Sequence, residues 1–263
     1  MLTDITIGQY IPGNTIVHNL DPRIKIIISI ILITALFFIK SFTGFLYFLL
    51  YITFIIFLAK LPVKRIIKGL KPILFLVILT LLLHVLFTRG GKVLWQWWVI
   101  RIDEHGLFTG LFMASRILLL IAFTSLLTLT TSPLQLTDGI EYLLSPFKRI
   151  GVPANELAMM MTIALRFIPT LMEEAEKIMK AQKARGADFE SGSIVQRARN
   201  LIPLLVPLFI SAFRRADDLA LAMESRCYRG GEGRTRLHEL QIQRRDIFSL
   251  IMSTIIAIFI SFF

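Results

Sequence analysis

Long apolar runs separated by short polar stretches dominate the first half of the chain and return at its end. A helix needs about 20 mostly apolar residues to cross the hydrocarbon core of a bilayer, and these runs come close to that length. They do not alternate apolar and polar positions, as the strands of a membrane barrel would. We therefore predict an all-α polytopic membrane protein with about five transmembrane helices. The predicted spans are Ile24 to Ile39, Phe42 to Ala59, Pro72 to Phe87, Leu107 to Leu129 and Ile247 to Phe263.

The stretch between the fourth and fifth runs has a different pattern, rich in charge but still helical in its periodicity. Ser132 and Pro133 are typical of a helix start and introduce a short amphipathic helix. A second helix is predicted from Pro153 to Ala184 or Arg185, where Gly186 can form a left-handed cap. The domain division expected is 1–131 for four spans, 132–246 for a cytosolic segment of long helices, and 247–263 for the last span.

A third helical stretch is predicted from about Ile194 to about Arg226, interrupted at Pro203 and Pro207. Two apolar runs within the 132–246 segment, Leu157 to Met172 and Leu201 to Phe213, could be mistaken for further spans. If both crossed the bilayer, the many lysines and arginines between them would lie outside the cell. We interpret both runs as helices on the cytosolic side.

Lysine and arginine orient the predicted spans. The net charge is +11 and 55% of the residues are hydrophobic. Of the 29 lysines and arginines, 24 fall on the side of the N-terminus and the 132–246 segment and 4 on the other side, and Arg116 lies within a predicted span. The positive-inside rule then places the N-terminus and the long segment in the cytosol and the C-terminus outside. The basic residues alternate with carboxylates, which argues against a nucleic-acid partner.

Catalytic chemistry has no recognisable pattern in the chain. No glycine-rich phosphate-binding loop with its lysine occurs, and the four histidines are scattered without metal-ligand spacing. The single cysteine excludes an intramolecular disulfide. We predict a protein that is not an enzyme and that needs no cofactor and no metal.

The two long helices of the 132–246 segment end alike. Lys180 to Gly186 matches Leu221 to Cys227 at an offset of 41 residues, and each match has small residues around one arginine. Such an arginine can offer its five donors to carboxylates and carbonyls of a partner groove. The alternative is that each arginine only complements the dipole of its helix. Two arginines in matching context favour the partner contact.

Five stretches resemble the T component of energy-coupling factor (ECF) transporters, a family that includes the transmembrane subunits for cobalt and biotin uptake. The resemblance extends from the N-terminus to the glycine-rich stretch Gly230 to Gly233, which follows the third predicted helical stretch. The matching stretches are Tyr10-Ile-Pro-Gly-Asn14 with Leu20-Asp-Pro-Arg-Ile-Lys25, Arg166-Phe-Ile-Pro-Thr-Leu-Met-Glu-Glu174, Ala181-Gln-Lys-Ala-Arg-Gly186 and Ala222-Met-Glu-Ser-Arg-Cys-Tyr-Arg-Gly230.

The resemblance implies a coupling subunit in a bacterial cell membrane. Its expected partners are the lipid bilayer, two ABC ATPase subunits that hydrolyse the ATP, and a substrate-binding membrane protein, the S component, for uptake of a vitamin or micronutrient. The arginine of each motif would insert into a groove of one ATPase. The motif residues are Ala184, Arg185, Gly186, Ser225, Arg226 and Cys227. Because Cys227 replaces the capping glycine, the third helix is expected to end later, at about Gly230.

The resemblance also implies that the apolar runs of the long helices receive the S component. The expected docking residues are Leu157, Met161, Leu165, Leu201, Leu205 and Phe209. The alternative is that these side chains pack the two helices against each other.

A self-contained secondary transporter or channel is the rival interpretation. Its substrate site would lie among the spans, where an ionisable residue usually marks it. Arg116 is the one charge deep in a predicted span, and His84 is the other polar candidate. Arg116 could equally extend its guanidinium to the membrane surface.

Overall fold

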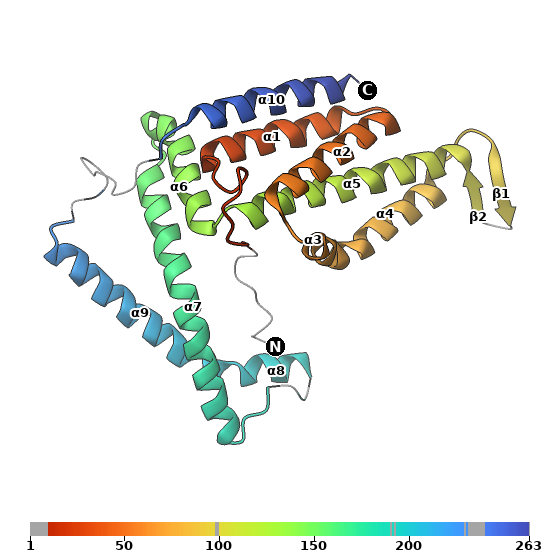
Figure 1. Ribbon diagram of the computed structural model, residues 1–263. Helices are drawn as coiled ribbons and strands as arrows, with labels where there is room; N and C mark the ends of the chain where they lie inside the picture. Colours follow the sequence, from red (N-terminus) through yellow and green to blue (C-terminus); the bar gives the residue numbers. More distant parts are fainter. Residues whose placement is uncertain are drawn as a thin grey trace. The chain divides into compact units, whose positions relative to one another are not determined.

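The fold is helical and divides into two compact units. The computed structural model describes residues 10–97, 100–189, 191, 193–228, 230 and 240–262. Residues 8–139 and 239–263 form one unit, here called the bundle unit. A second unit comprises residues 140–238 and is here called the arm unit. Figure 1 shows the helices of both.

The elements follow one another as predicted, with helices at each of the five expected spans. In chain order they are α1 (Pro22–Phe38), α2 (Phe42–Ala59), α3 (Val63–Leu70), the 3-10 turn η2 (Lys71–Ile73), α4 (Leu74–Phe87), β1 (Val93–Trp97), β2 (Ile100–Asp103), α5 (Glu104–Thr130), α6 (Pro133–Leu144), the 3-10 turn η3 (Ser145–Ile150), α7 (Ala154–Ala184), α8 (Ile194–Asn200), α9 (Ile202–Ser225) and α10 (Arg244–Ser261).

Three helices of the described chain are long and apolar enough to cross a membrane by themselves. They are Phe42–Ala59, Val63–Phe87, which joins α3 to α4, and Glu104–Thr130. α1 has the same character but only 17 residues, and α10 begins with the charged residues Arg244, Arg245 and Asp246. The chain is thus an all-α membrane protein with additional helices outside these spans.

In the bundle unit, α1 and α10 run in the same direction and α5 runs against them. The Asp246 carboxylate accepts a hydrogen bond from the backbone N–H of Asp21 at 3.1 Å and from that of Gln243 at 2.8 Å, which brings the starts of α1 and α10 together. At the other end, Arg116 in α5 donates to the carbonyl of Ile39, just after α1, at 2.9 Å. These directions agree with five spans that alternate along the chain.

The starts of α1 and α10 are tied down by polar residues that the sequence places around Pro22. The Asp21 carboxylate caps α1 and pairs with the Arg23 guanidinium at 2.7 Å, and Arg23 also donates to the carbonyl of Leu240. The Lys25 ammonium donates to the carbonyls of His18 and Thr130, each at 3.0 Å. Lys25 thereby joins the N-terminal segment, α1 and the end of α5.

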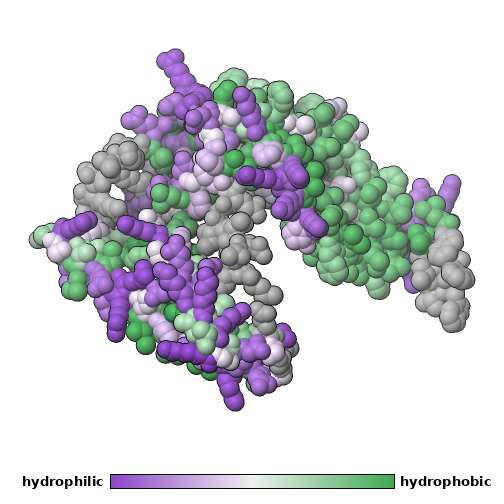
Figure 2. Space-filling model, turned by 60° about the horizontal axis from the view of Figure 1, so that its bottom comes forward, coloured by the Kyte–Doolittle hydropathy of each residue, from purple (hydrophilic) through white to green (hydrophobic). Residues whose placement is uncertain are grey.

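The core of the bundle unit is a continuous apolar cluster. Leu32 and Leu36 of α1 and Phe48 of α2 have no exposed surface. The outer faces of the same helices remain apolar; Leu50, for example, is 58% exposed. In Figure 2 this unit presents a largely hydrophobic surface. The hydrocarbon of a bilayer covers such a surface without cost, which is the condition of a membrane protein.

A hairpin between α4 and α5 was not predicted. β1 pairs with β2 in an antiparallel two-stranded sheet, with Gln96 opposite Arg101. Beside it, α4 and α5 approach closely because Gly106 faces the carbonyl of Thr88, and a Cβ built on Gly106 would lie 2.6 Å from that oxygen. A small residue at a helix contact of this kind is common in membrane proteins.

The arm unit consists of helices that bury little. α7 confirms the predicted long helix, which ends at Ala184. The third helical stretch breaks at Leu201, one residue before α9 begins, and α9 then continues through Pro207. Of the break sites predicted, Pro203 therefore lies in the first turn of α9, where a proline is tolerated, and Pro207 causes no interruption.

Candidate functional site

The end of α7 presents the first predicted arginine in a regular helix cap. Arg185 is the last residue with near-helical backbone, and Gly186 follows with φ 90°. The N–H of Gly186 donates to the carbonyl of Lys183, and the N–H of Ala187 donates to that of Gln182, both at 3.0 Å. This is the double hydrogen bond of a Schellman cap, and it fixes the backbone that carries Arg185.

The end of α9 repeats this cap bond for bond. The N–H of Cys227 donates to the carbonyl of Glu224 at 2.9 Å, and the N–H of Tyr228 donates to that of Met223 at 3.0 Å. Each donor and acceptor lies 41 residues after its counterpart in α7. The predicted sequence repeat is therefore also a repeat of structure.

The expectation that α9 ends later, at about Gly230, is wrong. α9 ends at Ser225, and Cys227 takes the left-handed conformation itself, with φ 57°. A residue with a Cβ adopts this conformation at a cost of about 1 kcal/mol relative to glycine, which the two cap hydrogen bonds offset. Arg226 is consequently held by the same backbone geometry as Arg185.

Both guanidinium groups are available to a partner. Arg185 and Arg226 are exposed, and neither has a hydrogen-bond or ion-pair partner among the residues that the structure describes. The flanking residues Ala184, Gly186 and Ser225 are also exposed and small. Each arginine can therefore enter a groove without displacing bulky neighbours.

α7 and α9 cross at an ion pair that the sequence reasoning missed. The Arg215 guanidinium donates to the Glu174 carboxylate at 2.8 Å. A hydrogen bond from the Ser211 side chain, together with Arg215, lowers the pKa of Glu174 below its ordinary value, so this carboxylate is ionised at neutral pH. Ala175 lies buried next to Glu174, where a small side chain lets the helices approach. Figure 1 shows α9 crossing α7, with the ends of the two helices apart.

The two residues that meet at the crossing are separated by the same offset as the sequence repeat. Glu174 and Arg215 are separated by 41 residues, the offset that also relates Arg185 to Arg226. Each arginine therefore lies about three helical turns, or ~16 Å, beyond the crossing on its own helix. The 41-residue spacing of Glu174 and Arg215 was visible in the sequence, but the repeat alone did not reveal that these two residues meet.

The predicted docking residues lie on the other side of the crossing. They occupy the first halves of α7 and α9 and are mostly exposed: Phe209 is 60% exposed and Leu205 44%, whereas Leu165 is half-buried. The alternative of mutual packing therefore has little support. Further apolar side chains that the prediction omitted are exposed in the same two half-helices: Met160, Ile202, Val206, Ile210 and Phe213.

Arg116, the focus of the rival interpretation, has a structural role in the bundle unit. Besides its bond to Ile39, its guanidinium carbon lies 5.0 Å from the centre of the Phe112 ring. It thus caps the buried carbonyl end of α1 from within an aromatic cluster. His84 is also engaged, through Nδ1 and the carbonyl of Thr80 at 2.8 Å.

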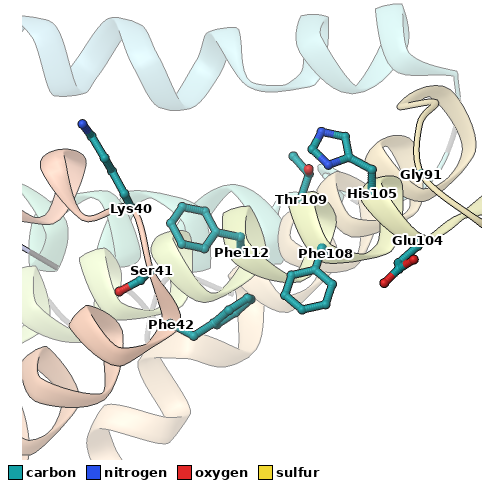
Figure 3. A pocket seen from close by; sticks show the side chains of 9 residues that line it. All are labelled: Lys40, Ser41, Phe42, Gly91, Glu104, His105, Phe108, Thr109 and Phe112. Carbon is teal, nitrogen blue, oxygen red and sulfur yellow. The ribbon is translucent and has the colours of Figure 1, made fainter.

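A cavity of about 600 Å³ near this cluster is one place where a substrate site among the spans would be sought. Figure 3 shows its aromatic rings, with the Lys40 and His105 side chains on one side of them. Neither Arg116 nor His84 lines it. Its lining residues are Lys40, Ser41, Phe42, Gly91, Glu104, His105, Phe108, Thr109 and Phe112.

Comparison with known proteins gives consistent matches over nearly the whole chain. The family model of the cobalt transport protein CbiQ matches residues 13–237. The energy-coupling factor transporter transmembrane protein EcfT of Thermosediminibacter oceani is 56% identical over 257 residues, which are 98% of this chain and 97% of that protein. Those of Clostridium kluyveri and Bacillus subtilis are 55% and 46% identical, covering 97% and 100% of this chain and 95% and 99% of their own lengths.

Proposed function

We propose that this chain, which belongs to the family of energy-coupling factor transporter transmembrane proteins, transmits the motion of two ABC ATPase subunits to a substrate-binding membrane subunit. As a member of this family it is the membrane component of a multi-subunit transporter. Hydrolysis of ATP is the task of the partner ATPases, and the transported compound is a vitamin or micronutrient that the S component captures.

The observation that carries this proposal is the pair of matched helix ends. Two ATPase subunits of similar fold offer two similar grooves, and a chain that contacts both needs two similar ligands. Arg185 and Arg226 meet this need because the cap hydrogen bonds, the exposed guanidinium groups and the distance to the crossing are the same for both. A bidentate, charge-assisted contact suits a carboxylate or a row of carbonyls in such a groove.

The crossing supports the proposed transmission. The arginines lie after the Glu174–Arg215 contact, and the exposed apolar residues, Leu205 and Phe209 among them, lie before it. When the ATPase pair closes or opens, the ends of α7 and α9 change their separation, and rigid helices carry that change through the crossing to the first halves. The S component docked there is then tilted or released.

The charge distribution supports an orientation of the chain in the membrane. With the N-terminus and the arm unit in the cytosol, the arginines face the compartment that holds ATP, and the C-terminus lies outside. The parallel directions of α1 and α10, joined at Asp21 and Asp246, are consistent with this arrangement.

The test is co-purification of the tagged chain from its native membrane. We expect two ABC ATPases to accompany the wild type and to be lost from the double variant Arg185→Glu with Arg226→Glu. Lys180→Glu with Arg214→Glu is the matched control, because it makes the same charge change at exposed positions of the same helices. Equal loss in both double variants, or no ATPase with the wild type, would overturn the proposal.

Cys227 offers a second readout, since it is the only cysteine, is exposed and adjoins Arg226. A maleimide should label Cys227 rapidly in the isolated chain and slowly in the assembled transporter. Equal labelling in both states would contradict a groove around Arg226.

A further inference from the structure

The bundle unit contains a cavity of about 450 Å³ whose walls are almost wholly apolar. α1, α2, α5, α10 and the segment before α1 contribute to it. Phe54 of α2, 60% exposed, and Phe248 of α10, 66% exposed, line it and also belong to the outer surface, so the cavity opens sideways between these helices. The apolar lining includes Ile28, Phe54, Phe123, Leu126, Met252 and Ile256.

Most polar groups in this cavity are already satisfied; within the part of the chain that the structure describes, the Ser249 hydroxyl and the Arg245 guanidinium are not. The Tyr51 hydroxyl is hydrogen-bonded to that of Ser253 at 2.8 Å, and the Ser29 hydroxyl donates to the carbonyl of Lys25. The Lys25 ammonium uses its donors on His18, Thr130 and Thr131. Arg245 is exposed, and its guanidinium has no hydrogen-bond partner among the described residues.

A second, polar compartment of about 400 Å³ adjoins the apolar one at Arg245 and Leu20, which line both. It lies at the starts of α1 and α10, and the carboxylates of Asp21 and Asp246 also line it. Both carboxylates are already engaged, Asp21 with Arg23 and Asp246 with the backbone N–H groups of Asp21 and Gln243. The helix dipoles and the exposed Arg245 guanidinium are the features that favour an anion there. Its lining also includes His18, which is 7% exposed and whose Nε2 atom is buried without a hydrogen-bond partner in the described part of the chain.

Water does not fill the apolar compartment, because a stable buried water needs two to four polar partners and most polar groups of the lining already have theirs. The medium around α2 and α5 is the hydrocarbon of the bilayer. A cavity that opens into hydrocarbon, with a free cation where the helices begin, fits an amphiphile with an anionic head.

We propose that the bundle unit binds a membrane phospholipid, with one acyl chain in the apolar cavity and its phosphate in the polar compartment beside Arg245. The guanidinium matches two phosphate oxygens. The lipid completes the packing of α1, α2, α5 and α10.

The test measures protection of the full-length chain by added lipid. The chain is purified in a maltoside detergent, and its Tm is recorded with and without phosphatidylglycerol, since a ligand that binds only the folded state raises Tm. Arg245→Gln is compared with Arg244→Gln, a neighbouring exposed arginine that lines neither compartment. Met252→Trp, which fills the cavity, is compared with Ile251→Trp on the exposed surface of the same helix.

We expect the lipid to raise the Tm of the wild type, Arg244→Gln and Ile251→Trp, and to have at least tenfold weaker apparent affinity for Arg245→Gln and Met252→Trp. Equal Tm values without lipid show that the variants fold. Equal responses of Arg244→Gln and Arg245→Gln would overturn the proposal, as would equal protection by further maltoside, which lacks a phosphate. If Met252→Trp instead releases a partner protein from the transporter and leaves lipid protection unchanged, the occupant is protein and the proposal fails.

Discussion

The bundle unit and the arm unit use apolar residues in opposite ways. In the bundle, Leu32, Leu36 and Phe48 are fully buried in one cluster. In the arm unit, the 31 residues of α7 bury only Ala154, Ala158 and Ala175, and α9 buries only Leu204. The bundle is therefore packed by its own residues and by lipid, whereas the arms keep large side chains exposed. This difference indicates that changes in the bundle alter stability, and changes in the arms alter partner binding.

The largest effect is expected when the same substitution, leucine to aspartate, is made in each unit. Leu50 lies in the middle of α2 and is 58% exposed, and Leu205 lies in α9 and is 44% exposed. Leu50→Asp should cost about 3 kcal/mol in membrane insertion, because the carboxylate would face hydrocarbon. Leu205→Asp should change stability by less than about 0.5 kcal/mol and yet release the S component. Insertion yield and co-purification measure the two effects, and similar results for both variants would erase the distinction between the units.

Next in size is the loss of the buried ammonium of Lys25. Lys25→Met should destabilise the bundle by about 2 to 4 kcal/mol, because the carbonyls of His18 and Thr130 lose their shared donor in a buried site. Thermal unfolding of the purified chain measures it. Lys180→Met in α7 is the control, and an equal loss there would mean that the two units do not differ as described.

The C-terminal caps of α7 and α9 should become less stable with a residue that disfavours the left-handed conformation and more stable with one that favours it. Gly186→Val should cost about 1 to 2 kcal/mol locally and weaken ATPase binding, since φ 90° is strained for a β-branched residue. Cys227→Gly should remove about 1 kcal/mol of backbone strain at this position and preserve ATPase binding. Hydrogen exchange at Ala187 and Tyr228 reports the cap bonds. A Cys227→Gly variant that loses the ATPases would show that the cysteine itself makes the contact.

The smallest effect on stability is expected at the crossing. Glu174→Arg or Arg215→Glu should cost less than about 1 kcal/mol, because the pair is partly exposed, but each should reduce transport; the double swap should restore it. Since the pKa of Glu174 is lowered, the contribution of the pair is present at neutral pH and is lost as pH falls through that lowered value. Transport assays of the four chains measure the coupling. Full activity of both single variants would exclude a role for the crossing.

Periodicity, proline and glycine were sufficient to predict most helices. The apolar runs predicted five helices and the ends of α7, because helix length and capping are local properties of the chain. The β1–β2 hairpin escaped prediction because the residues between its two short strands are not those typical of a hairpin turn. Cys227 escaped because two cap hydrogen bonds outweigh its unfavourable backbone preference.

Tertiary contacts account for the rest of what the sequence left open. Arg116 was ambiguous until its bond to Ile39 was seen, since sequence cannot say which carbonyl lies opposite a charge. The exposed state of Leu157 and Phe209 is likewise a property of the folded arms. Their assignment to the S component, and that of Arg185 and Arg226 to the ATPases, remains a proposal.

The most direct test of the proposed coupling is a distance measurement between the C-terminal ends of α7 and α9 in the assembled transporter. Spin labels on Lys180→Cys in α7 and on Leu221→Cys in α9, both in a Cys227→Ser background, report the separation of the two helix ends. A label pair at Thr34→Cys and Ile255→Cys in the same background serves as the bundle control. On addition of ATP, the arm distance should shift by on the order of 5 Å while the bundle distance stays unchanged. An arm distance that is the same with and without nucleotide would contradict the account.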